Sequence, residues 1–153
     1  MTLKTLTFAA SLTLLANTLA HAVGPVPNGR YKGTWICISA KADLPANNVT
    51  LVFTDRTIEW ESTGGFGYLH SVKTFATDAN GFMSFNITTD GRTPLGTGTG
   101  YTTRRGIHYE LKILGVPGEE TYVVAGPELV LLSSLEDLQN GRLHCEGRFT
   151  SAD

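Results

Sequence analysis

The sequence predicts an all-β protein, built as a single antiparallel up-and-down β-barrel of about eight to ten strands. Apolar and polar residues alternate in short segments along almost the whole chain, which is the pattern of strands with one buried face. Short runs rich in Gly, Asn and Asp separate these segments, as they do in tight hairpins. The two cysteines lie in the first and the last segment, so a disulfide between them joins the two ends of the sheet.

The first 22 residues have the features of a secretory signal peptide. Lys4 is their single charged residue, an apolar run follows from Leu6 to Leu19, and Ala20-His21-Ala22 has the small-x-small form of a cleavage site. Polar residues interrupt the run, whereas a transmembrane anchor needs about 20 consecutive apolar residues. We therefore expect residues 1–22 to be a signal peptide and residues 23–153 to form one β-barrel domain that is secreted or periplasmic.

The barrel strands are expected where the alternation is continuous, namely in Arg30–Ser39, Val49–Thr54, Thr57–Ser62, Phe66–Thr77, Phe82–Thr89, Leu95–Thr103, Ile107–Leu114, Thr121–Ala125, Leu129–Leu132 and Arg142–Thr150. Several connections hold residues that tolerate positive φ or preset a turn: Asp78-Ala79-Asn80-Gly81, Asp90-Gly91, Arg105-Gly106, Val116-Pro117-Gly118 and Asn140-Gly141. Hairpins are therefore the expected links between strands.

One short helical turn is expected before the last strand, over Ser133–Gln139. A serine stands at its start, acidic residues follow in its first turn, and Asn140-Gly141 ends it.

The two cysteines, Cys37 and Cys145, are expected to form a disulfide, because an even pair in an oxidising compartment is more often joined than free. If they face each other on antiparallel strands, Trp35 falls opposite Gly147 and Gly33 falls opposite Phe149. Each aromatic ring is then expected to cover a glycine, which is a common way to shield a backbone without a side chain. This register pairs the first strand with the last and closes the barrel.

The same register assigns the two faces of the closing strands. The expected interior face holds Tyr31, Gly33, Trp35, Cys37, Leu143, Cys145, Gly147 and Phe149. The opposite face is polar and holds Lys32, Thr34, Arg142, Glu146 and Arg148. A two-sheet sandwich with the disulfide between its layers is the alternative, because alternating strands and hairpins are common to both architectures.

The motif Gly33-Thr34-Trp35 resembles the glycine-x-tryptophan motif of lipocalins and their calycin relatives. That resemblance implies a barrel closed at one end by the tryptophan, with a ligand in its interior. In that family a basic residue late in the final strand lies across the tryptophan. Arg148 is the candidate for this role, although the register above directs it outward.

The leader, the small barrel and the end-to-end disulfide are also similar to the periplasmic inhibitors of c-type lysozyme. Gly98-Thr99-Gly100-Tyr101, followed by Tyr109 and Lys112, resembles their inhibitory loop. The resemblance implies a protein partner that is bound through a surface loop.

Two functions follow as expectations. The first is a non-enzymatic binding module that holds a small apolar ligand in the barrel, lined by Trp35, Phe53, Trp60, Tyr68, Phe85, Tyr109 and Leu111. The alternative is a protein-binding inhibitor, for example of lysozyme, that acts through residues 96–106. Its contact residues would be Tyr101, Arg104 and Arg105, because Tyr and Arg dominate interface energetics.

The sequence offers little support for catalysis or for charged partners. The serines lack the flanking glycines of a nucleophile elbow. His70, His108 and His144 lie on separate segments, and none has a second ligand at metal-binding spacing, so no metal or cofactor is expected. The net charge of −2 gives no reason to expect nucleic acid or an acidic membrane as a partner, and we expect a monomer.

Overall fold

The computed structural model describes residues 26–40, 43–137 and 141–153. All regular secondary structure in this part of the chain is β-strand. The strands are β1 (Gly29–Ile38), β2 (Asn47–Phe53), β3 (Thr57–Gly64), β4 (Leu69–Thr77), β5 (Phe82–Thr89), β6 (Thr93–Thr102), β7 (Gly106–Ile113), β8 (Val116–Ala125), β9 (Glu128–Asp137) and β10 (Gly141–Ser151). The predicted signal peptide lies outside the described residues and remains a prediction.

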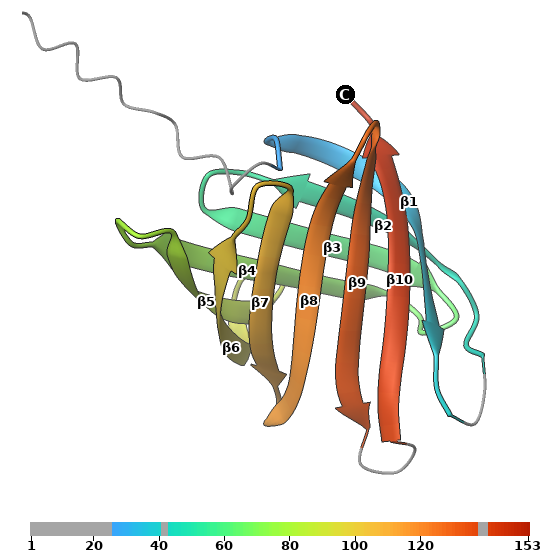
Figure 1. Cartoon of the computed structure of the whole chain (residues 1–153). Coiled ribbons are helices and arrows are strands. Elements are labelled where there is room, and N and C mark those ends of the chain that lie inside the picture. Colours follow the sequence, from blue (N-terminus) through green and yellow to red (C-terminus); the bar gives the residue numbers. More distant parts are fainter. Residues whose placement is uncertain (1–25, 41–42, 138–140) are drawn as a thin grey trace, which may run out of the picture.

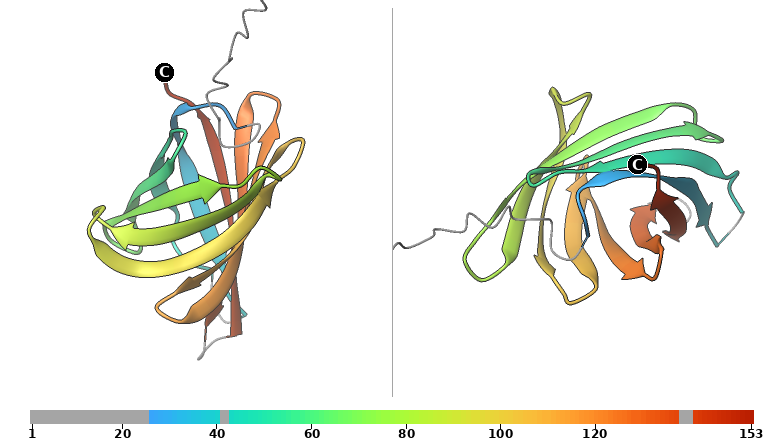
Figure 2. Two further views of the ribbon diagram at one scale, coloured as in Figure 1. Left: turned by 90° about the vertical axis from the view of Figure 1, so that its left-hand side faces the viewer. Right: turned by 90° about the horizontal axis from the view of Figure 1, so that it is seen from above.

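The ten strands form one closed antiparallel barrel (Figure 1). Each strand pairs with its neighbours in sequence, and β1 pairs with β10 to complete the ring. In Figures 1 and 2, β8 to β10 run at a steep angle to β3 and β4 on the opposite wall. The up-and-down barrel is thus confirmed and the sandwich alternative is wrong. Among the described residues, no helix is long and apolar enough to span a membrane.

The seam between β1 and β10 has the predicted register. Cys37 is opposite Cys145 and forms a disulfide with it, Trp35 is opposite Gly147, and Gly33 is opposite Phe149. The packing over the two glycines differs from the prediction. The Phe149 ring covers both Gly33 and Gly147, whereas Trp35 was expected to cover Gly147. A Cβ would lie 2.7 Å from this ring at Gly33 and 2.5 Å from it at Gly147.

The two faces of the closing strands are also as predicted. Tyr31, Cys37 and Phe149 are buried, whereas Arg148 is exposed. Arg148 donates hydrogen bonds to Glu146 at 2.9 Å and to Glu128 at 3.2 Å on the outer surface. It therefore does not lie across the tryptophan, as the lipocalin resemblance implied.

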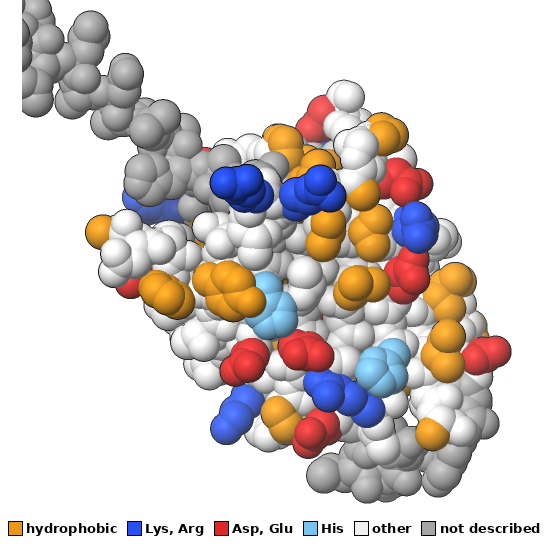
Figure 3. Space-filling model, in the orientation of Figure 1, with side chains coloured by type: hydrophobic (Ala, Val, Ile, Leu, Met, Phe, Trp, Pro, Cys, Tyr) orange, Lys and Arg blue, Asp and Glu red, His pale blue; other side chains and the backbone are white. Residues whose placement is uncertain are grey.

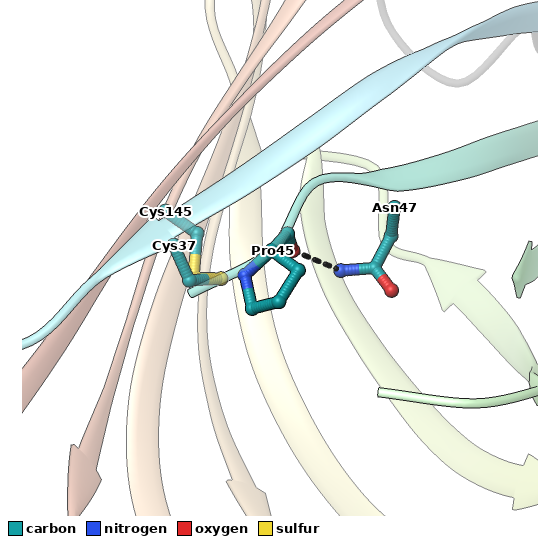
Figure 4. Close-up of a disulfide and its surroundings, with 4 residues drawn as sticks. All are labelled: Cys37, Pro45, Asn47 and Cys145. Atoms are coloured by element: carbon teal, nitrogen blue, oxygen red, sulfur yellow. Dashed lines mark hydrogen bonds between the residues drawn. A yellow bond between two sulfur atoms is a disulfide. The ribbon is translucent and has the colours of Figure 1, made fainter. Parts of the chain in front are cut away.

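The connection from β1 to β2 passes beside the disulfide (Figure 4). The fully buried Asn47 holds this connection in place. Its Nδ2 donates to the carbonyl of Pro45 at 3.2 Å, and its Oδ1 accepts from the backbone N–H of Phe66 at 3.2 Å. One buried amide thus joins the start of β2 to the β3–β4 connection, where both of its polar ends are paired.

The helical turn predicted over Ser133–Gln139 is wrong for its described part, because β9 continues as a strand to Asp137. Ser133 is opposite Glu120 of β8 on one side and opposite Cys145 of β10 on the other. The backbone groups of this segment therefore bond to two neighbouring strands. That pairing outweighs the local helix signals of the sequence.

The turn predicted at Val116-Pro117-Gly118 is also wrong, because these residues begin β8. The chain reverses two residues earlier, at Leu114 and Gly115, which have φ values of 51° and 82°. Pro117 is exposed and lies opposite Lys112 near the end of the β7–β8 hairpin. The hairpin is thus closed by a two-residue turn of the kind that favours Asn-Gly.

Candidate functional site

The residues predicted to line a ligand lie inside the barrel, with one exception. Tyr68, on the β3–β4 connection, is 62% exposed and does not line the interior. The others belong to the core or pack against it: Trp35, Phe53, Trp60, Phe85, Tyr109 and Leu111. Tyr68 falls outside the strands, where the inward–outward alternation no longer fixes the direction of a side chain.

Aromatic rings contact one another across the lumen. Phe53 of β2 meets Tyr122 of β8 with ring centroids 5.3 Å apart and an interplanar angle of 89°. Trp60 meets Phe149 at 6.3 Å in a similar edge-to-face arrangement. These contacts join opposite walls of the barrel, so side chains fill much of its interior.

A polar pair lies within this aromatic interior. Lys73 Nζ of β4 is 3.3 Å from Glu120 Oε2 of β8, and the two side chains are 5% and 17% exposed. Three strands separate β4 from β8 in the barrel wall, so the pair crosses the lumen. The ammonium group also lies 5.9 Å from the centre of the Tyr109 ring. We call Lys73, Tyr109, Glu120 and Tyr122 the interior polar cluster.

The two tyrosine hydroxyls of the cluster lie near Glu120 and near each other, but neither forms a well-aligned hydrogen bond. Tyr109 and Tyr122 are buried, their ring centroids are 6.1 Å apart, and no described group lies in hydrogen-bonding geometry with either hydroxyl. Glu120 Oε2 also accepts no hydrogen bond. Burial, and next the negative charge of Glu120, raise the pKa of both tyrosines well above the usual value. Both hydroxyls therefore keep their protons and can donate them to a hydrogen-bond acceptor.

A second candidate site lies on the outside of the barrel. Two clefts of about 770 and 740 Å³ share the lining residues Ala76, Ser84, Thr99 and Glu110. They are therefore one continuous depression over β4 to β7 that reaches β8 to β10 at one end, and we call it the outer groove. Its floor carries uncharged polar side chains that point outward from β4, β5 and β6, namely Thr74, Ser84, Asn86, Thr97 and Thr99.

The two ends of the outer groove differ in chemistry. Phe82, Tyr101 and His108 form one end, and Lys112, Glu119, Glu136 and Arg142 form the other. Figure 3 looks onto the outer face of β7 to β10. Hydrophobic side chains and one histidine lie side by side on it, with acidic and basic side chains intermingled nearby.

The three contact residues of the predicted inhibitor lie on the β6–β7 hairpin. Tyr101 is 46% exposed and packs against His108 with ring centroids 5.3 Å apart. Arg104 and Arg105 are exposed in the connection that follows. The hairpin thus brings one aromatic and two basic side chains to the outer surface, at the aromatic end of the outer groove.

The histidines lie on three different strands and have separate environments. His70 of β4 contacts Asp90 through Nδ1 and Glu59 through Nε2, both at 2.7 Å. The hydrogen bond to Asp90, followed by that to Glu59, raises the pKa of His70 above 6.5. His108 Nδ1 lies 2.7 Å from Thr121 Oγ1. Both ring nitrogens of His70 are engaged, so it acts as a link between the β3 strand and the β5–β6 turn.

Of the interior polar cluster, only Tyr109 is predicted from the sequence. Lys73 has the same strand parity as the buried Phe75, which was a usable signal for an inward direction. Glu120 lies just before the expected strand Thr121–Ala125, so the alternation assigns its side chain no direction. With β8 starting at Val116, Glu120 has the parity of Tyr122 and also points inward.

Comparison of the chain with protein-family models, with curated proteins and with solved structures found no match.

Proposed function

We propose that the chain is a secreted, non-enzymatic binding protein that holds a small molecule with one polar end inside its barrel, at the interior polar cluster. The observation that carries this proposal is that three buried polar atoms of this cluster, Tyr109 Oη, Tyr122 Oη and Glu120 Oε2, form no well-aligned hydrogen bond, although Glu120 Oε2 is ion-paired with Lys73. The disulfide between Cys37 and Cys145 supports an oxidising compartment such as the cell exterior or the periplasm.

Unpaired polar atoms in a protein core need a physical reason. Each costs about 1–3 kcal/mol when its hydrogen bond is not replaced, and folded proteins pair nearly all such groups with protein atoms or water. A bound molecule that pairs these hydroxyls would recover that free energy on binding. The cluster would thus favour the liganded state of the protein.

The chemistry of the cluster changes the ligand expected from the sequence. A wholly apolar molecule would leave the hydroxyls of Tyr109 and Tyr122 unpaired and would desolvate the Lys73–Glu120 pair further. A ligand with a hydrogen-bond acceptor at one end would accept from the tyrosines, while its apolar body packs on the aromatic walls. The ring contacts across the lumen favour a small molecule over a long acyl chain.

Native mass spectrometry of the exported protein tests the proposal, together with mass analysis of an organic extract. We expect a co-purified small molecule, and we expect Tyr122→Phe to reduce its occupancy. Because that hydroxyl forms no well-aligned hydrogen bond in the protein, its removal should cost the unliganded protein little stability.

Tyr31→Phe is the matched control. The Tyr31 hydroxyl donates to the carbonyl of Pro27 at 2.9 Å, so its loss should lower stability by about 1 kcal/mol without changing ligand occupancy. An empty protein from its native source, or equal effects of the two substitutions on occupancy, would contradict the proposal.

Inhibition of a lysozyme through the β6–β7 hairpin stays a prediction. Its support is the joint exposure of Tyr101, Arg104 and Arg105 on one hairpin. Rate measurements on a panel of muramidases with the purified protein at micromolar concentration test it. If no enzyme is slowed, the inhibitor function is excluded for that panel.

A further inference from the structure

We infer that the outer groove is a binding site for a neutral oligosaccharide. This site is separate from the interior polar cluster, because its floor is built from the outward positions of β4, β5 and β6. Three features of the groove carry the inference, namely its floor, its aromatic end and its distribution of charge.

The floor is a continuous surface of hydroxyl and amide groups. Thr74 is opposite Asn86, and Asn86 is opposite Thr97 on the next strand. Ser84 and Thr99 form the adjacent pair. These five side chains make no hydrogen bonds within the described part of the protein, so their polar atoms are free for a ligand. Hydroxyl and amide groups both donate and accept, which matches the hydroxyls of a sugar.

The aromatic end of the groove offers ring faces beside this polar floor. Phe82 and Tyr101 are directly opposite each other on β5 and β6, and they are 59% and 46% exposed. The face of a sugar ring that carries C–H groups is apolar and packs on such aromatic rings, while its hydroxyls remain free to form hydrogen bonds. An exposed pair of rings next to a hydroxyl-lined floor therefore suits the mixed surface of a pyranose chain.

The charges of the groove argue against other polymers. The β4, β5 and β6 part of its floor carries no charge, Glu110 of β7 adds a carboxylate that lines both clefts, and at the far end Arg142 is paired with Glu119 at 3.1 Å. A nucleic acid would need a basic groove to neutralise its phosphates. A protein partner would favour Trp, Tyr or Arg at the centre of the contact, whereas Ser and Thr are uncommon as binding hot spots. The centre of this groove, where its two clefts meet, is lined by Ala76, Ser84, Thr99 and Glu110.

Isothermal titration calorimetry with the full-length protein tests the inference, using cellohexaose, chitohexaose, maltohexaose and xylohexaose as probes. We expect at least one of them to bind. Tyr101→Ala and Asn86→Ala should each weaken that binding by about tenfold or more, the equivalent of one lost stacking or hydrogen-bonding contact. Tyr68→Ala is the matched control, because Tyr68 is also an exposed tyrosine but lies outside the groove. It should leave the affinity unchanged.

Two results would overturn the inference. One is no heat of binding from any of the four hexasaccharides at millimolar concentration. The other is binding that Tyr68→Ala weakens as much as Tyr101→Ala does. Binding of a muramidase that depends on Tyr101, with no binding of sugars, would assign the groove to a protein partner instead. Thermal unfolding of each variant shows whether the fold is retained. The proposal for the interior site is tested separately by mass spectrometry, so a failure to bind sugars would not count against it.

Discussion

At the scale of single residues, Leu114 is the clearest case of a side chain in an unfavourable setting. It is 78% exposed and has a φ of 51°, in the left-handed region that suits Gly and Asn. We expect Leu114→Asn to raise the free energy of unfolding by about 1 kcal/mol. Urea-induced unfolding measures this change.

Leu114→Ala is the comparison for this prediction, because alanine suits a φ of 51° no better than leucine does. It should leave stability almost unchanged. If Leu114→Asn proves destabilising, the backbone strain assigned to this turn is absent.

The Lys73–Glu120 pair gives a second prediction at this scale. Lys73→Met leaves the carboxylate of Glu120 inside the barrel without its counter-ion, and we expect a loss of about 3 kcal/mol or more. The double variant Lys73→Met/Glu120→Leu removes both charges and should recover most of that loss. A double-mutant cycle by urea unfolding tests this. Additive losses from the two single variants would mean that the charges are not coupled across the lumen.

At the scale of the strands, His70 links three elements and makes their association pH-dependent. Its ring bonds Glu59 of β3 and Asp90 of the β5–β6 turn, and its pKa is raised in the folded protein. The charged imidazole is therefore favoured by folding. The stabilisation is fully present below the unfolded pKa of about 6.5 and is lost as pH rises through the higher folded value.

We therefore expect the melting temperature to fall as the pH rises above about 6.5, and this fall should be absent in His70→Gln. Melting curves of the two proteins over the same pH series measure the difference. The same slope in both proteins would show that other groups set the pH dependence.

The elements also show what the sequence could and could not predict. Alternation located all ten strands, and the pairing of Cys37 with Cys145 predicted the register of the seam. The strand conformation of Ser133 to Asp137 was not predicted. Their local helix signals compete with backbone hydrogen bonds to the two neighbouring strands, which sequence reasoning does not weigh. The Lys73–Glu120 contact escaped as well, because strand parity gives the direction of a side chain but not its partner across a lumen.

At the scale of the whole molecule, the disulfide constrains almost the entire barrel. It joins residues that are 108 positions apart. In the chain-entropy model, closing a loop of this length stabilises the folded state by about 4–5 kcal/mol. We expect the variant Cys37→Ala/Cys145→Ala to lose about that amount in urea unfolding. Reductant should destabilise the wild type similarly and leave the variant unchanged.

The pairing of β1 with β10 also sets the order in which the barrel can be completed. Until β10 has paired, β1 has β2 as its only neighbour, and its other edge has no strand to bond. That edge is covered only when the last eleven-residue strand becomes available. Until then the nascent protein resembles an open sheet that can recruit a second copy. Chaperones that shield the chain before its final strand emerges would protect it during this interval.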